Sequence, residues 1–287
     1  MSAVGRAVTF GRMIRFSHSI FALPFALASV ALAAGRDVPW PQFLWILVAM
    51  VGARSAAMGF NRLADHAIDA RNPRTAAREL PKGGLSRTEV WVFVAASAAL
   101  LVLAAAMLNP LCLALSPVAL LIVFGYSYTK RFTALSHLAL GLALGVAPVG
   151  AWIAVRGSLD AVPFVLGLAV LAWVAGFDII YACQDVDFDR REGLHSIPAG
   201  LGVRRALVVS RLLHVAAVAL LLLLYPLAPR LHPVYVAGVV GVAALLAYEH
   251  RLVRHDDLSR VDAAFFTVNG WISVGYFAAT LAARLLA

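Results

Sequence analysis

The sequence predicts an all-α, polytopic membrane protein, and three observations support this. First, 62% of the 287 residues are apolar and only 14% are charged, against roughly 45–50% and about 25% in soluble domains. Second, the mean hydropathy is +0.86. Third, nine apolar stretches each approach the length of about 20 residues that a membrane-spanning helix needs. Together they exclude a disordered chain and argue against a soluble single-domain enzyme.

The nine stretches are separated by short polar or charged segments. The first is preceded by Arg6, Arg12 and Arg15 and continues through Ala34 without a cleavage site, so it is expected to be a retained helix rather than a signal peptide. The predicted helices cover 16–34, 41–63, 88–108, 111–128, 133–154, 161–182, 205–226, 232–249 and 261–283.

Prolines mark several of the boundaries between these stretches, as expected for a residue that interrupts helices. They are Pro41, Pro110, Pro163, Pro226 and Pro233. The fifth stretch follows the basic pair Lys130 and Arg131, and the ninth follows a charged segment that ends near Arg260. Cys112 and Cys183 both lie inside apolar stretches, which excludes a disulfide framework or a zinc site and predicts buried packing residues.

The basic residues predict the orientation in the membrane. With the N-terminus in the cytoplasm, 18 of the 24 Lys and Arg residues fall in cytoplasmic segments. Only four, Arg36, Arg156, Arg230 and Arg284, fall on the other side, and Arg54 and Arg211 lie within spans. This asymmetry follows the positive-inside rule and favours an odd number of helices. It also explains the net charge of +9 without a nucleic-acid partner.

Two long cytoplasmic loops, after the second and sixth stretches, resemble each other. One reads NRLADHAIDARNPRTAARELPKGGL from Asn61, and the other reads QDVDFDRREGLHSIPAGLG from Gln184. We expect residues 1–287 to form one membrane domain with a weak internal repeat, the first half covering about 1–130 and the second about 131–287. Transporters and membrane enzymes both use such repeats, so the repeat does not separate them.

Each of these loops carries two aspartates four residues apart. Asp65 and Asp69 form the first pair, and Asp185 and Asp189 form the second. On a helix, this spacing places both carboxylates on one face. Like charges beside a membrane core are costly unless cations bind between them. Carboxylate oxygens suit Mg²⁺, which proteins commonly hold with one or two carboxylates and phosphate oxygens.

Cationic side chains surround both pairs. They are Arg62, Arg74, Arg78, Lys82, Lys130, Arg131, Arg190 and Arg191. Carboxylates for a metal and cations for phosphate oxygens together indicate a diphosphate site. The alternative is a solvated cytoplasmic face held by ordinary ion pairs.

Deeper residues leave two questions open. Arg54 lies about two helical turns further into the membrane than Asn61, and it either binds an anionic substrate or pairs with the similarly placed Asp178. Tyr126, Tyr128 and Tyr181 either form an interfacial belt or stabilise a carbocation with their ring faces.

At these residues the chain resembles the UbiA superfamily of membrane prenyltransferases. The first family motif, Asn-x-x-x-Asp-x-x-x-Asp, falls at Asn61, Asp65 and Asp69, with Arg62 where many members have Asp. The second, Asp-x-x-x-Asp, falls at Asp185 and Asp189. The segments GFDIIYACQDVDFDRREGLHSIP and YSYTKRFTALSH resemble the 4-hydroxybenzoate polyprenyltransferase branch.

The resemblance implies a bundle of nine helices around a central apolar chamber, and transfer of a polyprenyl group from polyprenyl diphosphate to a hydroxylated aromatic acid. It implies Mg²⁺ at the four motif aspartates, which would be the catalytic residues. Asn61, Lys130, Arg131, Arg78 and Lys82 would bind the diphosphate. Arg54, Asp178 and Tyr181 are the expected acceptor-binding residues. The expected location is the bacterial inner membrane, with the site at the cytoplasmic face.

The identity of the acceptor stays open within this interpretation, and rival classes of protein exist beside it. The acceptor is either 4-hydroxybenzoate or 1,4-dihydroxy-6-naphthoate, because IRFSHSIFALPFALASV and ARNPRTAARELPKGGLS resemble members assigned to menaquinone synthesis. An inverted-repeat transporter would carry carboxylates near the midplane. A CDP-alcohol phosphotransferase keeps its aspartates in one stretch, whereas these pairs lie 120 residues apart. Neither isoprenoid length nor oligomeric state has a sequence signal.

Overall fold

The computed structural model describes residues 3–14, 21–34, 39–228 and 231–287, and the all-α prediction is confirmed. Apart from one isolated bridge between Arg254 and Asp257, the described chain has no β-structure. The helices are α1 Ala3–Met13, α2 Leu23–Ala34, α3 Trp40–Arg71, α4 Arg87–Leu108, α5 Pro110–Thr129, α6 Ser136–Arg156, α7 Ala161–Ala182, η2 Cys183–Asp185, α8 Val186–Glu192, α9 Ile197–Leu201, α10 Val203–Leu227, α11 Val234–Leu252, η3 Ala263–Val268 and α12 Asn269–Leu285.

Nine apolar helices correspond in order to the nine predicted stretches, but the count of nine membrane spans is not confirmed. Among the described residues, seven helices are long and apolar enough to cross a membrane. The helix α2 has 12 residues, and the predicted residues 16–20 before it lie outside the described chain. The other exception is α11, which ends in the polar sequence Glu249, His250 and Arg251. The chain is a multi-pass membrane protein with at least these seven candidate spans.

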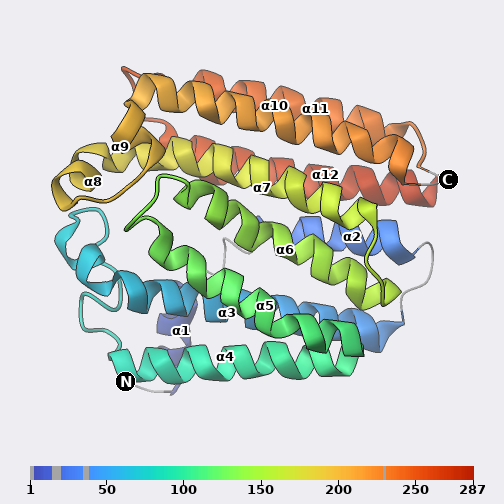
Figure 1. Cartoon of the computed structure of the whole chain (residues 1–287), viewed down its shortest axis with the longest axis horizontal. Coiled ribbons are helices and arrows are strands. Elements are labelled where there is room, and N and C mark those ends of the chain that lie inside the picture. The colour runs from blue at the N-terminus through green and yellow to red at the C-terminus, as the bar shows by residue number, and fades with distance from the viewer. Residues whose placement is uncertain (1–2, 15–20, 35–38, 229–230) are drawn as a thin grey trace.

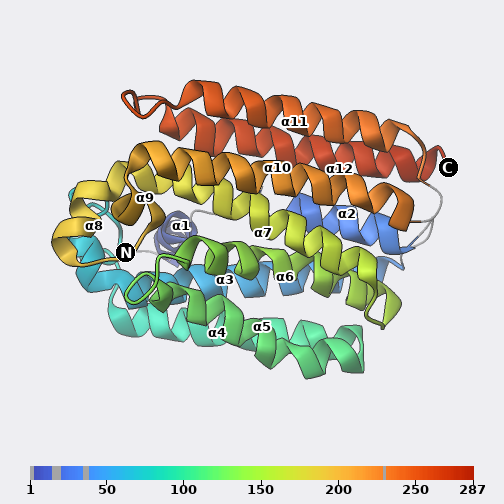
Figure 2. The ribbon, with the colours of Figure 1, turned by 45° about the horizontal axis from the view of Figure 1, so that its top comes forward.

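The long helices lie roughly side by side in a flattened bundle, with α4 and α5 along one side and α11 along the other (Figures 1 and 2). Helix α7 lies at the centre of the bundle. In the apolar helical stretch to which it belongs, 67% of the residues are buried, against 17% in α5. Its packing partners include α6, α10, and α2. The largest buried cluster is centred on α7 and takes side chains from α2, α10, α11 and α12.

Close approach of α6 and α7 depends on glycine. A Cβ atom built on Gly145 would lie 2.6 Å from the carbonyl oxygen of Gly167, and one on Gly167 would lie 2.9 Å from the carbonyl oxygen of Gly145. Only hydrogen side chains allow this backbone contact, as is common where membrane helices pack without a hydrophobic driving force. The left-handed Gly157, with φ of 67°, then ends α6.

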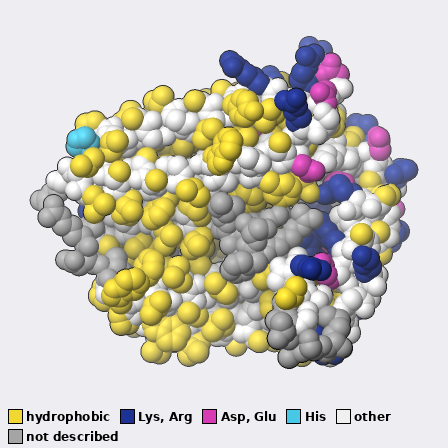
Figure 3. Space-filling view, turned by 180° about the vertical axis from the view of Figure 1, so that it is seen from behind, with side chains coloured by type: hydrophobic (Ala, Val, Ile, Leu, Met, Phe, Trp, Pro, Cys, Tyr) yellow, Lys and Arg dark blue, Asp and Glu magenta, His cyan; other side chains and the backbone are white. Residues whose placement is uncertain are grey.

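One end of the bundle carries the short helices α8 and α9 and the loop that follows α3 (Figure 1). Charged side chains gather at this end, while the sides of the molecule are mainly hydrophobic (Figure 3). The first predicted loop begins later than expected. Helix α3 continues to Arg71, eight residues past the predicted end at 63. The physical reason is that its polar final turns leave the apolar bundle but are stabilised by ion pairs. Arg15, Arg36 and Arg230, used for the orientation, lie outside the described residues.

Candidate functional site

A single cavity of about 780 Å³ begins at the charged end of the bundle and continues between the helices. Its charged end includes the four motif aspartates, and its deeper wall is formed by apolar side chains of α3 to α7 such as Met50, Leu115 and Leu144. The expected apolar chamber is therefore present, with all four carboxylates at one end of it.

The first motif occupies the last turns of α3, where its three side chains follow one another along one helix face. The Asn61 amide nitrogen donates to Oδ2 of Asp65 at 3.2 Å. Asp65 and Asp69 are both buried, with 3% and 4% exposure. Buried carboxylates need compensating cations, and each of these two has its own.

Asp65 is compensated by the basic pair at the end of α5. Lys130 Nζ lies 2.6 Å from its Oδ2, and Arg131 Nη2 lies 3.1 Å from its Oδ1. Arg131 also donates to the carbonyl oxygens of Ser127 and Ala64, both at 2.7 Å. These bonds fix Arg131 between α3 and α5, so it acts as a clamp between the helices. It does not line the cavity, whereas Lys130 does.

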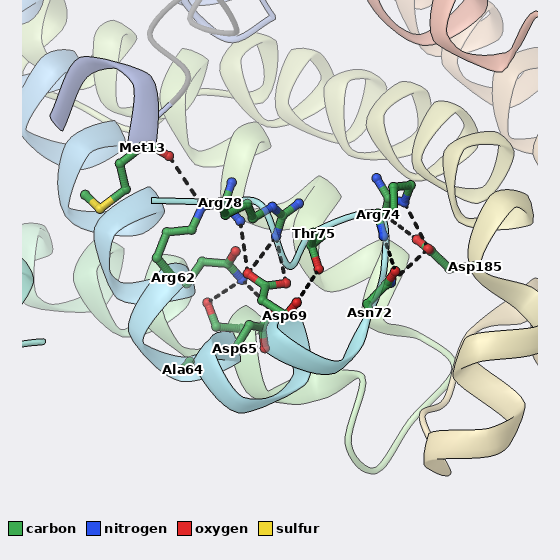
Figure 4. Close-up of polar contacts among 12 residues, drawn as sticks. Met13, Arg62, Ala64, Asp65, Asp69, Asn72, Arg74, Thr75, Arg78 and Asp185 are labelled. Atoms are coloured by element: carbon green, nitrogen blue, oxygen red, sulfur yellow. Dashed lines mark hydrogen bonds and ion pairs between the residues drawn. The ribbon is translucent and has the colours of Figure 1, made fainter. Parts of the chain in front are cut away.

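Asp69 is compensated from the loop that follows α3. Arg78 Nη1 donates to Oδ1 and Oδ2 of Asp69 at 2.8 and 2.7 Å, and Arg62 Nη1 lies 3.7 Å from Oδ2 (Figure 4). The Thr75 hydroxyl donates to the main-chain carbonyl of Asp69 at 3.0 Å. The loop therefore folds back over the helix end and brings Arg78 to the carboxylate.

The second motif faces the same loop from the other side (Figure 4). Arg74 Nε donates to Oδ1 of Asp185 at 3.0 Å, and a second, shorter contact joins Arg74 Nη2 to Oδ2. Asn72 Nδ2 donates to the same Oδ1 at 3.1 Å. Arg74 and Asn72 thus join the segment after the first motif to the first carboxylate of the second.

Arg74 also contacts an expected acceptor-binding residue. Its Nη1 donates to the Tyr181 hydroxyl at 2.7 Å, and its guanidinium carbon lies 4.8 Å from the centre of the Tyr181 ring. Burial acts to lower the pKa of Arg74, but the hydrogen bonds and charge of Asp185 and Tyr181 outweigh it and raise the pKa above its ordinary value. The guanidinium is therefore charged at every physiological pH.

Asp189 lies one turn further along, in α8, and its partner is a hydroxyl rather than a cation. Ser196 Oγ donates to Oδ2 of Asp189 at 2.8 Å and also caps α9 by accepting from the main-chain N–H of Ala199. The left-handed Gly193, with φ of 67°, ends α8 and turns the chain toward Ser196. Asp189 thus keeps more free acceptor capacity than the other three carboxylates.

The structure shows which of the deeper residues line the cavity and which side chain pairs with Asp178. Arg54, Asp178, Tyr126 and Tyr181 all line the cavity. Asp178 pairs with His137, whose Nδ1 lies 2.7 Å from its Oδ2, and the opposite nitrogen, Nε2, accepts from the main-chain N–H of Ile197. An N–H can only donate, so Nε2 carries no proton and Nδ1 is the donor to Asp178.

The three tyrosines do not behave as one group. Tyr126 and Tyr181 face the cavity, while Tyr128 is 46% exposed and lies against Arg131, whose guanidinium carbon is 5.1 Å from the ring centre. The interfacial-belt interpretation therefore fits Tyr128 only.

One expected diphosphate ligand lies apart from the others. Lys82 is exposed and is not among the residues that line the cavity. In contrast, Arg74 belongs to the predicted basic cluster without a specific role, and the sequence pattern assigns no role to His137, Asn72 or Ser196. The turn-forming dipeptide Asn72-Pro73 is a sequence signal near Asn72 and Arg74, whereas no sequence signal indicates His137 or Ser196.

Within the described residues, no three His, Cys, Asp or Glu side chains are close enough together to hold a metal ion by themselves. Two pairs of carboxylates at opposite walls of the cavity mouth are a different arrangement. Oxygen donors of this kind fit Mg²⁺, which rarely uses an all-protein cage and takes the rest of its ligands from phosphate and water.

Comparison with known proteins decides the class. Residues 22–271 match the model of the UbiA prenyltransferase family. The chain belongs to this family. It is a prenyltransferase, which decides against the transporter and the CDP-alcohol phosphotransferase. The 4-hydroxybenzoate octaprenyltransferase of Xanthomonas euvesicatoria pv. vesicatoria (strain 85-10) is 34% identical over 82% of this chain and 78% of that protein. The corresponding protein of Xanthomonas campestris pv. campestris (strain B100) is 35% identical over 88% and 84%.

Solved structures of the UbiA family have the same fold. The apo structure of a UbiA homologue from Aeropyrum pernix K1 is 36% identical and superimposes with a TM-score of 0.84 over 92% of this chain and 97% of that one. A UbiA homologue from Archaeoglobus fulgidus, bound to DMAPP and Mg²⁺, is 21% identical with a TM-score of 0.78 over 97% and 100%. The second likeness concerns the fold alone.

Proposed function

We propose that this prenyltransferase moves a polyprenyl group from polyprenyl diphosphate to a ring carbon of 4-hydroxybenzoate, with Mg²⁺, for quinone biosynthesis. The observation that carries the proposal is the cavity itself. Its charged end gathers Asp65, Asp69, Asp185 and Asp189 with Lys130, Arg74 and Arg78, and the rest of its wall is mainly apolar. A ligand with an anionic head and a long hydrocarbon tail matches this distribution.

The diphosphate would bind where carboxylates and cations alternate. Lys130 and Arg78 each hold one motif carboxylate and also line the cavity, so each can turn its charge toward a phosphate oxygen. Asn61 offers its amide beside Asp65. Arg131 would keep α3 and α5 together through its two main-chain bonds. Lys82, which is exposed, would act at most as an outer charge that attracts the donor.

The four motif aspartates would hold Mg²⁺ together with the diphosphate oxygens. When bound, the metal would act as a Lewis acid that favours departure of the diphosphate. Because the two carboxylate pairs come from separate helix ends, oxygens of the donor diphosphate would complete the coordination of the metal. A UbiA homologue from Archaeoglobus fulgidus was solved bound to DMAPP and Mg²⁺.

Departure of the diphosphate with the electron pair of the broken C–O bond leaves an allylic cation in the cavity. A ring carbon of the acceptor attacks this cation to form the new C–C bond, and the same carbon then loses its proton to the released diphosphate, which restores aromaticity. The apolar wall excludes the water that would otherwise capture it. Tyr126 and Tyr181 would present ring faces to the positive charge. Arg54 would bind the acceptor carboxylate, and Asp178, held by the Nδ1 proton of His137, would face the acceptor ring and its hydroxyl.

We further propose that the protein lies in the bacterial inner membrane, with its N-terminus and the charged end of the bundle toward the cytoplasm. The concentration of charged side chains at this end supports the orientation. The donor would then enter from the bilayer with its tail and meet the cytoplasmic acceptor at the mouth of the cavity. Oligomeric state carries no signal in the chain.

The test is a membrane assay with labelled octaprenyl diphosphate and Mg²⁺. 4-Hydroxybenzoate and 1,4-dihydroxy-6-naphthoate are offered in parallel, each with an EDTA control. We expect EDTA-sensitive prenylation of 4-hydroxybenzoate, as in the named activity of the Xanthomonas relatives. Prenylation of the naphthoate alone would mean that the acceptor is the naphthoate, and the rest of the proposal would stand. Failure with both acids, in correctly folded protein, would overturn the proposal.

Removing one motif carboxylate tests the metal assignment. The variant Asp65→Ala leaves Lys130 and Arg131 without their partner and removes one of the oxygen donors. We expect turnover to fall below detection, because the donor and its metal lose a ligand at the reacting bond. Turnover of the variant is measured in the same membranes, with thermal unfolding as the check on folding. Retained Mg²⁺-dependent turnover would contradict the assignment.

A further inference from the structure

The start of the last helix departs from α-helical geometry directly beside the cavity. Residues Ala263–Val268 form the π-helix η3, which continues without a break into α12. A π-helical turn contains one extra residue and shifts main-chain carbonyls away from their normal donors. Such turns are rare and occur often at functional sites, so this one needs a physical cause.

The side chain of Asn269 stabilises this turn. It is fully buried, and its Nδ2 lies 3.1 Å from the carbonyl oxygen of Ala264 and 3.3 Å from that of Phe265. The same Nδ2 lies 3.0 Å from Oε1 of Glu249, so its two hydrogens are shared among three acceptors. One side chain thus donates to two successive main-chain carbonyls of the π-helix.

Two other helices hold Asn269 in this orientation. Trp173 of α7 donates its indole N–H to Oδ1 of Asn269 at 2.7 Å. Because an indole N–H can only donate, the amide cannot be reversed. Glu249 of α11 is fully buried and accepts from the nitrogen side. The carbonyl of Trp173 lies 3.2 Å from Nε2 of His214 on α10. The network therefore joins α7, α10, α11 and α12 at a distance from the motif aspartates.

The segment that Asn269 fixes supplies one wall of the cavity. Phe265 lies in η3, lines the cavity, and has its ring centre 4.2 Å from that of Tyr181. It also packs edge-on against Phe177 with centres 5.1 Å apart. Tyr181 in turn accepts the hydrogen bond from Arg74, which holds Asp185. The network thus contacts the aromatic wall on one side, and that wall contacts the second motif on the other.

We propose that Asn269, with Glu249 and Trp173, is a positioning residue that fixes Phe265 against Tyr181 and so sets the aromatic wall of the reaction chamber. This inference rests on the proposed prenyl transfer. Asn269 does not touch the substrate. It acts through Phe265, whose ring packs against Tyr181 in the cavity wall and closes the chamber against water.

The central experiment is a double-mutant cycle with Asn269→Ala and Phe265→Leu. Steady-state kinetics and the ratio of prenyl alcohol to prenylated acid are measured for each variant. Asn269→Ala is expected to lower kcat by about 10- to 100-fold, as displacements near 1 Å do, with KM for the donor unchanged and a larger share of prenyl alcohol. The double variant should be no slower than Phe265→Leu, because both changes act through one ring. Additive losses would overturn the inference.

A second pair of variants avoids the chance that Asn269→Ala fails to fold. Glu249→Gln keeps an acceptor oxygen toward Asn269, whereas Glu249→Leu removes it. We expect wild-type kcat and product ratio for Glu249→Gln and the Asn269→Ala pattern for Glu249→Leu. The matched control is Thr280→Val in α12, the helix that begins with Asn269. This change removes a buried hydrogen bond from the Thr280 hydroxyl to the carbonyl of Tyr276. Equal product ratios in Glu249→Leu and Thr280→Val would contradict the positioning role.

A measurement without turnover separates this inference from the proposed function. Amide hydrogen exchange across residues 261–270 should be faster in Asn269→Ala and Glu249→Leu than in the wild type and in Thr280→Val. Absence of turnover in the wild type would overturn the proposed function. The exchange data would still test whether the side chains of Asn269, Glu249 and Trp173 stabilise η3. Unchanged exchange in both variants would overturn the network as the support of η3.

Discussion

At the scale of the residue, each motif carboxylate has a specific partner, and the partners differ. Asp65 has Lys130 and Arg131, Asp69 has Arg78, and Asp185 has Arg74. Among the described residues, the side-chain hydrogen-bond partner of Asp189 is the Ser196 hydroxyl, without an ion pair. Compensated carboxylates can exist in the bundle without a metal, because a buried charge is stable when it is paired and hydrogen-bonded. The same cations are then close at hand when a diphosphate enters.

Arg54 provides a test of acceptor binding. It lines the cavity and lies seven residues, about two helical turns, before Asn61 in α3. We expect Arg54→Leu to raise KM for the aromatic acid about tenfold or more, because a charge-assisted hydrogen bond contributes about 1.5–3 kcal/mol. KM for the donor should change less. Arg254→Leu, in an exposed pair with Asp256, is the matched control. An unchanged acceptor KM in Arg54→Leu would count against the role.

Arg74 tests the connection between the two motifs. Its planar guanidinium bonds both oxygens of Asp185 and the hydroxyl of Tyr181, and lysine cannot reproduce this set. We expect Arg74→Lys to raise KM for the donor and the Mg²⁺ requirement by about tenfold, since about 1.4 kcal/mol corresponds to that factor. Titrations of donor and metal in the membrane assay measure both effects. A wild-type Mg²⁺ dependence would show that Asp185 does not need Arg74.

At the scale of the element, the site depends on how helix ends are joined. The end of α3, the loop after it and the short helix α8 meet through Arg74–Asp185, Asn72–Asp185 and the pair of Arg71 with Glu192 at 2.7 Å. The basic end of α5 is tied to α3 through Asp65. These contacts connect segments more than 60 residues apart in sequence. They join the two loops that resemble each other, although the internal repeat itself stays a prediction.

Two glycine-to-alanine changes, one at the α6–α7 contact and one in α5, should have different effects on Tm. Gly145→Ala places a Cβ 2.6 Å from the Gly167 carbonyl oxygen, whereas Gly125→Ala in α5 meets nothing within 4 Å. Alanine favours a helix by about 0.5–1 kcal/mol over glycine, so Gly125→Ala should leave Tm equal or higher. Gly145→Ala should lower Tm, because two backbones must separate. Thermal unfolding in detergent compares the two, and a stable Gly145→Ala would contradict the close packing.

At the scale of the whole molecule, charge is separated along the bundle. Charged side chains gather at the end that holds α8 and α9, and the sides are hydrophobic (Figure 3). This is the distribution of a protein whose sides face lipid and whose charged end faces water. The cavity lining includes charged groups of this end, where the proposed water-soluble acceptor and lipid-soluble donor would meet.

The topology can be tested with reporter fusions. With the N-terminus in the cytoplasm and an odd number of spans, alkaline phosphatase fused after Ala287 should be active, because it folds only outside the cytoplasm. Fluorescent protein fused after Gly193, in the second loop, should be bright, because that loop lies in the cytoplasm. Bright fluorescence from a fusion at Ala287 would place the C-terminus in the cytoplasm and would contradict an odd number of spans with a cytoplasmic N-terminus.

The sequence by itself determined the class of fold, the order of the apolar helices and the paired spacing of the four motif aspartates. Each depends on local information: apolar length, charge asymmetry, and i, i+4 spacing on one helix face. The same local pattern could not decide the partner of Asp178 or the different surroundings of Tyr126 and Tyr128. Nor could it show that Lys82 lies apart from the cavity while Arg74 holds Asp185.

Those features were decided by the tertiary structure alone. His137 meets Asp178 across 41 residues, and Asn269 meets Trp173 across 96. Contacts of this kind depend on which helices pack together and at what rotation, and no periodicity in a single helix contains that information. The π-helix at Ala263–Val268 is the extreme case, because its carbonyls are satisfied by a side chain that two other helices hold in place.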